Sequence, residues 1–100
     1  MRRVRRTDLA RDEIADALDY LEERSAVAAE RLTAMIEEKC RLLATNPFMG
    51  RARDELRPGH RSVVVGDYLL FYRVTDFEVI VVRFLHGRRD LPTALDADPT

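Results

Sequence analysis

The first half of the chain carries apolar residues at the three- and four-residue spacing of amphipathic helices. The apolar positions are Ala10, Ile14, Ala17, Leu18 and Leu21 in one segment, and Ala28, Ala29, Leu32, Met35, Ile36 and Leu43 in the next. Thr7 is a favourable N-cap for a first helix to about Glu23, and Ser25 for a second. The second helix ends at Asn46, because the residue before a proline is disfavoured in the α region. The short link between the segments predicts an antiparallel helical hairpin.

The second half of the chain changes to the two-residue period of β-strands. Two apolar runs, 62–65 and 68–72, flank Gly66 and Asp67, a dipeptide typical of a two-residue hairpin turn. A further turn at 75–78 leads into a third run at 79–85, which is rich in the residues that strands favour. Val4 lies between arginines and suits a short edge strand, because charges on an edge discourage unwanted strand pairing.

These elements predict one α+β domain over residues 1–100, in the order β-α-α-β-β-β, with the helical hairpin packed on a small antiparallel sheet. The domain divides into a strand and helical hairpin (1–46), a charged connector (47–60), antiparallel strands (61–86) and a C-terminal tail (87–100). We expect the tail to be irregular or to hold a short helix.

The turns also predict which strand residues share a face of the sheet. If the turns are centred on 66–67 and 76–77, Tyr72 pairs with Val81 and Leu70 pairs with Arg83. One face is then apolar enough to be the core beneath the helices, and its members are Val64, Leu69, Phe71, Ile80, Val82 and Phe84. The opposite face mixes apolar, aromatic and arginine side chains, namely Arg61, Val63, Tyr68, Leu70, Tyr72, Val81, Arg83 and Leu85.

This opposite face has the composition of a protein-binding surface, since interfaces are enriched in aromatic residues and arginine. The alternative is that its arginines only form salt bridges with acids of the connector or tail. We predict that the partner-binding residues are Arg61, Tyr68, Leu70, Tyr72, Val81, Arg83, Leu85, Arg88 and Arg89. In this register Arg83→Ala weakens partner binding more than folding, whereas Phe84→Ala opens a cavity in the core.

Charge favours a protein partner over direct binding to a nucleic acid. The chain of 100 residues has a formal net charge of −1, and arginine supplies all but one of its 17 Lys and Arg residues. Nucleic-acid binders usually carry a positive excess, whereas arginine suits carboxylate pairing at interfaces. Cys40 is the only cysteine, which excludes an internal disulfide and favours the reducing cytoplasm. No apolar run is long enough for a membrane span, and the basic start lacks the apolar stretch of a secretory signal.

The sequence predicts no catalytic residue, no metal site and no cofactor. His86 falls at a strand end without a nearby nucleophile or paired carboxylate, and His60 sits in the connector, so structural roles are expected for both. Asp8, Asp12 and Asp16 share a helical face but lack further ligands, which favours a solvated surface. The chain has no glycine-rich phosphate loop and no nucleophile–base constellation.

Several segments, in this order and spacing, together resemble one family. They are Asp12, Ile14 and Tyr20 in the first helix, Leu43 to Pro47, Pro47 to Arg51, Leu56 to Arg61, Tyr68 to Arg73, and Arg83 to Asp90. Over nearly the whole chain they resemble ParE toxins of the RelE/ParE superfamily of toxin–antitoxin systems. The resemblance implies the fold predicted above, inhibition of DNA gyrase, and neutralisation by a ParD-like antitoxin. It also implies that operator DNA is contacted only through the antitoxin.

The same superfamily includes ribosome-dependent mRNA endonucleases such as RelE. Their active surface uses basic residues on the sheet and a C-terminal Tyr or His. Arg61 and Arg83 match the basic part, but the chain after His86 holds no Tyr or His. A RelE-like endonuclease is therefore the alternative to a gyrase inhibitor, and a remnant that has lost its toxicity is a third hypothesis.

Overall fold

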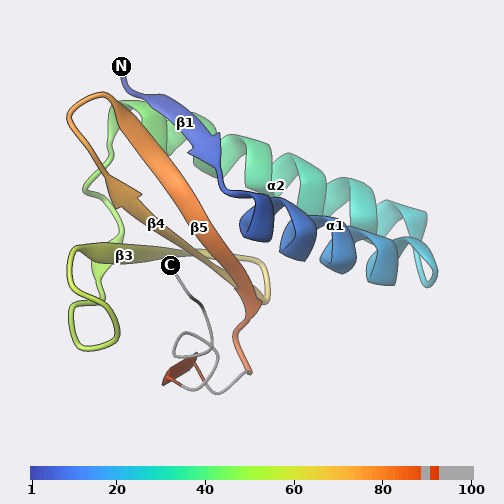
Figure 1. The fold of residues 1–100 in the computed structure, drawn as a ribbon. Helices are drawn as coiled ribbons and strands as arrows, with labels where there is room; N and C mark the ends of the chain where they lie inside the picture. Colours follow the sequence, from blue (N-terminus) through green and yellow to red (C-terminus); the bar gives the residue numbers. More distant parts are fainter. Residues whose placement is uncertain (89–90, 93–100) are drawn as a thin grey trace.

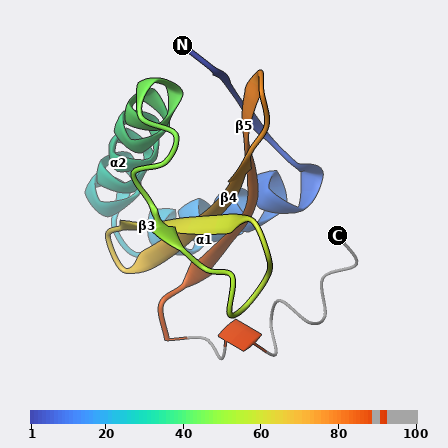
Figure 2. The same ribbon diagram turned by 90° about the vertical axis from the view of Figure 1, so that its left-hand side faces the viewer.

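The computed structural model describes residues 1–88 and 91–92. Its elements are β1 (Arg3–Arg6), α1 (Asp8–Glu22), α2 (Ala26–Thr45), β2 (Arg51–Ala52), β3 (His60–Val65), β4 (Tyr68–Val74) and β5 (Glu78–His86). The strands form a five-stranded sheet in the order β1-β5-β4-β3-β2. Both helices pack against one face of this sheet (Figures 1 and 2). The predicted α+β class with a helical hairpin is confirmed.

Local sequence signals place the helix ends as expected. The hydroxyl oxygen of Thr7 accepts the N–H of Ala10 at 3.1 Å, and that of Ser25 accepts the N–H of Ala28 at 3.2 Å. These bonds satisfy amides that lack a partner within the helix. The second helix ends before Asn46, as the following proline requires. The helices bury Ala10, Ile14, Ala17, Ala29, Leu32, Ile36 and Leu43, all at helical spacing.

The sheet is mixed and not purely antiparallel as predicted. Strands β3, β4 and β5 form the expected antiparallel hairpins, but β1 pairs in parallel with β5 along its whole length. The antiparallel helices return the chain to the beginning of β1, where the N–H of Arg2 donates to the carbonyl of Ala44 at 2.8 Å. The connection from β1 to β5 is long enough for the parallel pairing that a tight hairpin turn cannot give. The connector also contains the two-residue strand β2, which pairs with β3 and is too short to produce a periodic signal.

A β-bulge changes the register between β4 and β5. The β3–β4 hairpin and the pairing of Tyr72 with Val81 are as predicted. Beyond that pair, Leu70 lies opposite Phe84 and not opposite Arg83. One extra residue of β5 lies between these pairs, and a bulge of this kind moves every later side chain to the other face.

The prediction of which face meets the helices is wrong for most of the sheet. The helix-facing cluster contains Val63, Val65, Leu70, Tyr72, Val79, Val81 and Phe84. Of the predicted core positions only Phe84 belongs to it, and Val64 is 62% exposed. A second cluster on the opposite face contains Phe71, Ile80, Val82 and Leu85, packed against Leu56, Leu69 and Leu91. Both faces are apolar, so the two-residue period did not indicate which one the helices cover.

Candidate functional site

The structure separates the predicted partner-binding residues instead of gathering them on one exposed face. Leu70, Tyr72 and Val81 are fully buried under the helices, and Leu85 is buried in the second cluster. Their predicted exposure is wrong, because helices cover one face and the connector and Leu91 cover the other. Arg61 and Tyr68 are half-buried, and Arg88 is exposed. Arg89 lies outside the described residues.

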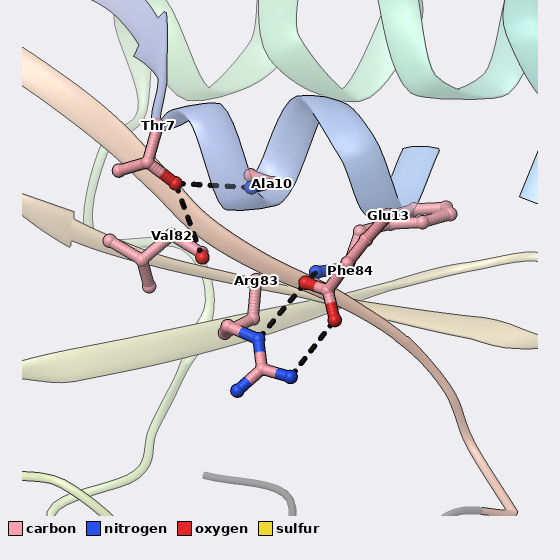
Figure 3. Close-up of polar contacts among 6 residues, drawn as sticks. All are labelled: Thr7, Ala10, Glu13, Val82, Arg83 and Phe84. Carbon is pink, nitrogen blue, oxygen red and sulfur yellow. Dashed lines mark hydrogen bonds and ion pairs between the residues drawn. The ribbon is translucent and has the colours of Figure 1, made fainter. Parts of the chain in front are cut away.

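Arg83 forms an ion pair within the chain. Its Nε and Nη2 atoms donate to the two carboxylate oxygens of Glu13 on α1 at 3.0 and 2.9 Å (Figure 3). Only 7% of the Arg83 side chain and 14% of the Glu13 side chain is exposed. The carboxylate also accepts the N–H of Phe84 at 3.0 Å. The predicted exposed position of Arg83 is therefore wrong, and the pair attaches α1 to β5 just after the bulge.

The bulge is held by the junction between β1 and α1. The N–H of Thr7 donates to the carbonyl of Val81 at 3.0 Å. The Thr7 hydroxyl donates to the carbonyl of Val82 at 3.4 Å (Figure 3). Sequence reasoning missed Glu13, although a signal was present. Glu13 lies at helical spacing between Ala10 and Ala17, and a carboxylate on a buried helical face usually needs a cationic partner.

A groove of about 510 Å³ lies between the helical hairpin and the β3–β4 turn. We call it the hairpin groove; its lining is Tyr20, Leu21, Ala28, Arg31, Leu32, Met35, Gly66, Asp67, Tyr68 and His86. Met35 passes close to the turn, where a Cβ on Gly66 would lie 3.4 Å from its Cε atom. Gly66 also has a φ of 60°, a conformation that favours glycine. Gly66 thus permits both the tight turn and the close approach of the helix.

Tyr68 is held in the wall of this groove by two ring contacts. It stacks on Phe84 with 4.8 Å between ring centroids, and meets His86 edge-on at 5.3 Å. Burial raises the pKa of Tyr68, and Asp67 and Tyr20 raise it further, so its hydroxyl stays neutral at physiological pH. His86 accepts the N–H of Arg88 through Nδ1 at 3.1 Å. Fixed aromatic rings beside arginine suit the binding of a protein segment.

A second groove, of about 430 Å³, follows the free edge of β1. We call it the edge groove; its lining is Arg3, Val4, Arg5, Arg6, Arg11 and Cys40. The amide of Arg3 donates to Phe77 just before β5, and that of Thr7 donates to Val81 in β5. The alternation of a parallel pair then directs the peptide groups of Val4 and Arg6 outward. Arg5 pairs with Glu78 at 3.2 Å, whereas the described part of the chain provides no ion pair for the other three arginines. The edge groove therefore suits an extended, acidic segment.

Comparison with known proteins assigns the family. Residues 4–91 match the family described as the ParE toxin of the type II toxin–antitoxin system, parDE. The chain belongs to the ParE toxin family. It is 45% identical over 64 residues to Toxin ParE1 of Mycobacterium tuberculosis, a match that spans 63% of this chain and 65% of that relative. It is 32% identical over 77 residues to Toxin ParE3 of Caulobacter vibrioides, spanning 77% of each.

Solved structures share the fold of this member of the ParE toxin family. The chromosomal ParDE TA system from P. aeruginosa matches with a TM-score of 0.67 and 19% identity, over 86% of this chain and 96% of that one. The E. coli DinJ–YafQ complex matches with a TM-score of 0.63 and 15% identity, over 87% and 94%. Within residues 1–88 and 91–92, neither helix is long and apolar enough to cross a membrane.

Alkaline pH is expected to destabilise the toxin through Tyr72. Burial raises the pKa of this phenol above its usual value, against the smaller lowering effects of the Gly50 N–H and the Arg61 guanidinium. The unfolded chain therefore ionises first, and the stability present below about pH 10 is lost as the pH rises above it. Urea unfolding across this range should show a shallower decline for Tyr72→Phe. An equal decline in both proteins would contradict the assignment to Tyr72.

Proposed function

We propose that this ParE-family toxin acts by inhibiting DNA gyrase, and that a ParD-like antitoxin neutralises it by occupying the hairpin groove. The observation that carries the proposal is the exposed apolar and aromatic lining of that groove, because single chains seldom leave such a surface uncovered. The fold is shared with the chromosomal ParDE system, whose own description names such a pair.

The unpaired arginines of the edge groove support an acidic antitoxin segment. An extended acidic segment satisfies both the outward peptide groups of Val4 and Arg6 and the nearby guanidinium groups. Co-expression with the antitoxin encoded beside this toxin should give a complex stable to purification. Hydrogen exchange should then show added protection in α2 and at the β3–β4 turn. A failure to copurify, or unchanged exchange in both segments, would exclude this binding mode.

Met35→Ala is expected to weaken antitoxin binding at least about tenfold, as loss of an anchor in a buried interface does. Leu42→Ala is the matched control, because both residues lie on α2 with similar exposure, 42% and 39%, but only Met35 lines the groove. Calorimetric titration of each variant with the antitoxin provides the comparison. If the two variants bind equally well, the hairpin groove is not the antitoxin site.

Gyrase inhibition and the endonuclease alternative are distinguished by measuring plasmid supercoiling and messenger RNA integrity in the same expressing cells. We expect plasmid supercoiling to be lost while messenger RNA stays intact. The buried ion pair between Arg83 and Glu13 supports gyrase over the ribosome as the target. An RNA-cleaving surface would need the Arg83 cation, which Glu13 already binds. Codon-specific cleavage of messages with unchanged supercoiling would replace this proposal with a RelE-like endonuclease.

A further inference from the structure

Two phenylalanines stand on the surface of the toxin at the same end of the molecule. Phe48 follows the end of α2 and is 58% exposed, and Phe77 lies in the β4–β5 turn and is 82% exposed. The N-terminus, the end of α2 and the β4–β5 turn lie at the same end of the molecule in both views (Figures 1 and 2). Phenylalanine is usually buried, so exposed rings gathered at one place indicate a binding surface.

Three hydrogen bonds hold the loop that carries Phe48, and one of them is buried. The Gly50 N–H donates to the hydroxyl oxygen of Tyr72 at 2.9 Å. Arg61 donates through Nη1 to the carbonyl oxygens of Phe48 and Gly50, at 3.2 and 2.9 Å. A Cβ on Gly50 would lie 2.5 Å from the Tyr72 oxygen, so only glycine fits this contact. Phe48 is therefore presented in a fixed position.

The turn that carries Phe77 is also fixed by its own hydrogen bonds. The hydroxyl oxygen of Thr75 accepts the N–H groups of Phe77 and Glu78 at 3.3 and 2.9 Å. The Thr75 N–H donates to the carbonyl of Glu78 at 2.8 Å. Both rings thus stand on ordered loops, and binding them costs little conformational entropy.

Arg2 connects the two loops. Its Nε donates to the carbonyl of Thr75 at 3.0 Å, and its guanidinium lies 5.6 Å from the centre of the Phe48 ring. The guanidinium of Arg61 lies 5.3 Å from the same ring. Within the described residues, neither arginine forms an ion pair. We call Arg2, Phe48, Arg61 and Phe77 the two-loop surface.

We propose that the two-loop surface binds the protein on which this toxin acts, through an acidic patch of that protein. Aromatic rings and arginines have the composition of interface hot spots, and the guanidinium groups of Arg2 and Arg61, which form no ion pair within the described residues, can each bind a carboxylate of a partner. This inference rests on the proposed function, in which the toxin acts by binding a protein. An RNA is disfavoured, because the exposed Asp76 lies beside Phe77 and the chain has a net charge of −1.

The two-loop surface lies far from the hairpin groove. Tyr68, at one end of β4, lines the hairpin groove, and the turn that carries Phe77 follows Val74 at the other end. A strand of this length spans about 20 Å. Substitutions of Phe48 and Phe77 should therefore leave the hairpin groove intact, and neither residue lines the edge groove.

The test is a Phe48→Ala and Phe77→Ala double variant, with Val27→Ala and Val64→Ala as a matched control of exposed apolar residues outside both surfaces. We expect the Phe variant to keep the wild-type melting temperature and to copurify with the antitoxin. It should be at least about tenfold weaker in arresting growth and in inhibiting supercoiling by purified gyrase, since hot spots dominate binding. The control should match the wild type throughout.

Each other outcome decides against a different part of the proposal. A Phe variant that arrests growth like the wild type overturns the two-loop surface while leaving gyrase inhibition in place. If the Phe variant fails to copurify with the antitoxin, the two-loop surface binds the antitoxin. If the wild type and the control bind single-stranded RNA and the Phe variant does not, the surface binds a nucleic acid. A wild-type toxin that arrests growth without affecting supercoiling refutes gyrase as the target. Comparing growth arrest by the wild type and the Phe variant then still tests whether the two-loop surface binds the target. A wild-type toxin without any growth arrest overturns both proposals.

Discussion

Arg83→Ala is expected to lower the free energy of unfolding by about 3–5 kcal/mol, because it leaves the carboxylate of Glu13 buried without its cation. The pair also places the helix against the bulged strand, since the same carboxylate accepts the N–H of Phe84. Urea unfolding measures the loss. Arg5→Ala is the control, because it removes an ion pair with Glu78 that is substantially exposed and should change stability by less than about 1 kcal/mol.

Replacing both Glu13 and Arg83 distinguishes the contribution of the ion pair to stability from that of side-chain packing. Glu13→Leu combined with Arg83→Met should recover most of the stability lost by Arg83→Ala, because buried pairs are often replaceable by apolar residues of similar volume. If Arg83→Ala is as stable as the wild type but fails to bind the antitoxin, Arg83 is an interface residue and the ion pair has no stabilising role.

Phe84→Ala is expected to destabilise the toxin by about 3–5 kcal/mol through the cavity that it leaves. Phe84 is buried beneath the helices and its ring stacks on Tyr68. Loss of the stack should also free Tyr68 in the wall of the hairpin groove, so antitoxin affinity should fall together with stability. Thermal unfolding should show a decrease of more than about 10 °C, since 1 kcal/mol corresponds to about 4–8 °C in a domain of this size.

Phe77→Ala is the stability control for this substitution, because it removes the same side chain from an exposed turn. Its melting temperature should remain within about 2 °C of the wild type, as surface substitutions usually do. A stable Phe84→Ala variant would mean that β5 has no bulge and that Phe84 points away from the helices.

Neighbouring residues determined the parts of the fold that the sequence predicted. The caps at Thr7 and Ser25, the end of α2 and the turn at Gly66 each depend on contacts across a few positions of the chain. The positions of the helices and strands were also predictable from the period of their apolar residues, because each element buries one or both of its faces. The family resemblance came from the same short segments, and the match over residues 4–91 confirms it.

The tertiary structure alone decided where the candidate functional side chains lie. Both faces of the strands are apolar, so the sequence allowed either face to meet the helices, and one bulged residue in β5 reversed the positions after it. Glu13 lies 70 residues from Arg83 on α1, and Arg2 links the loops that carry Phe48 and Phe77. Such contacts form between distant parts of the chain, and no local spacing predicts them.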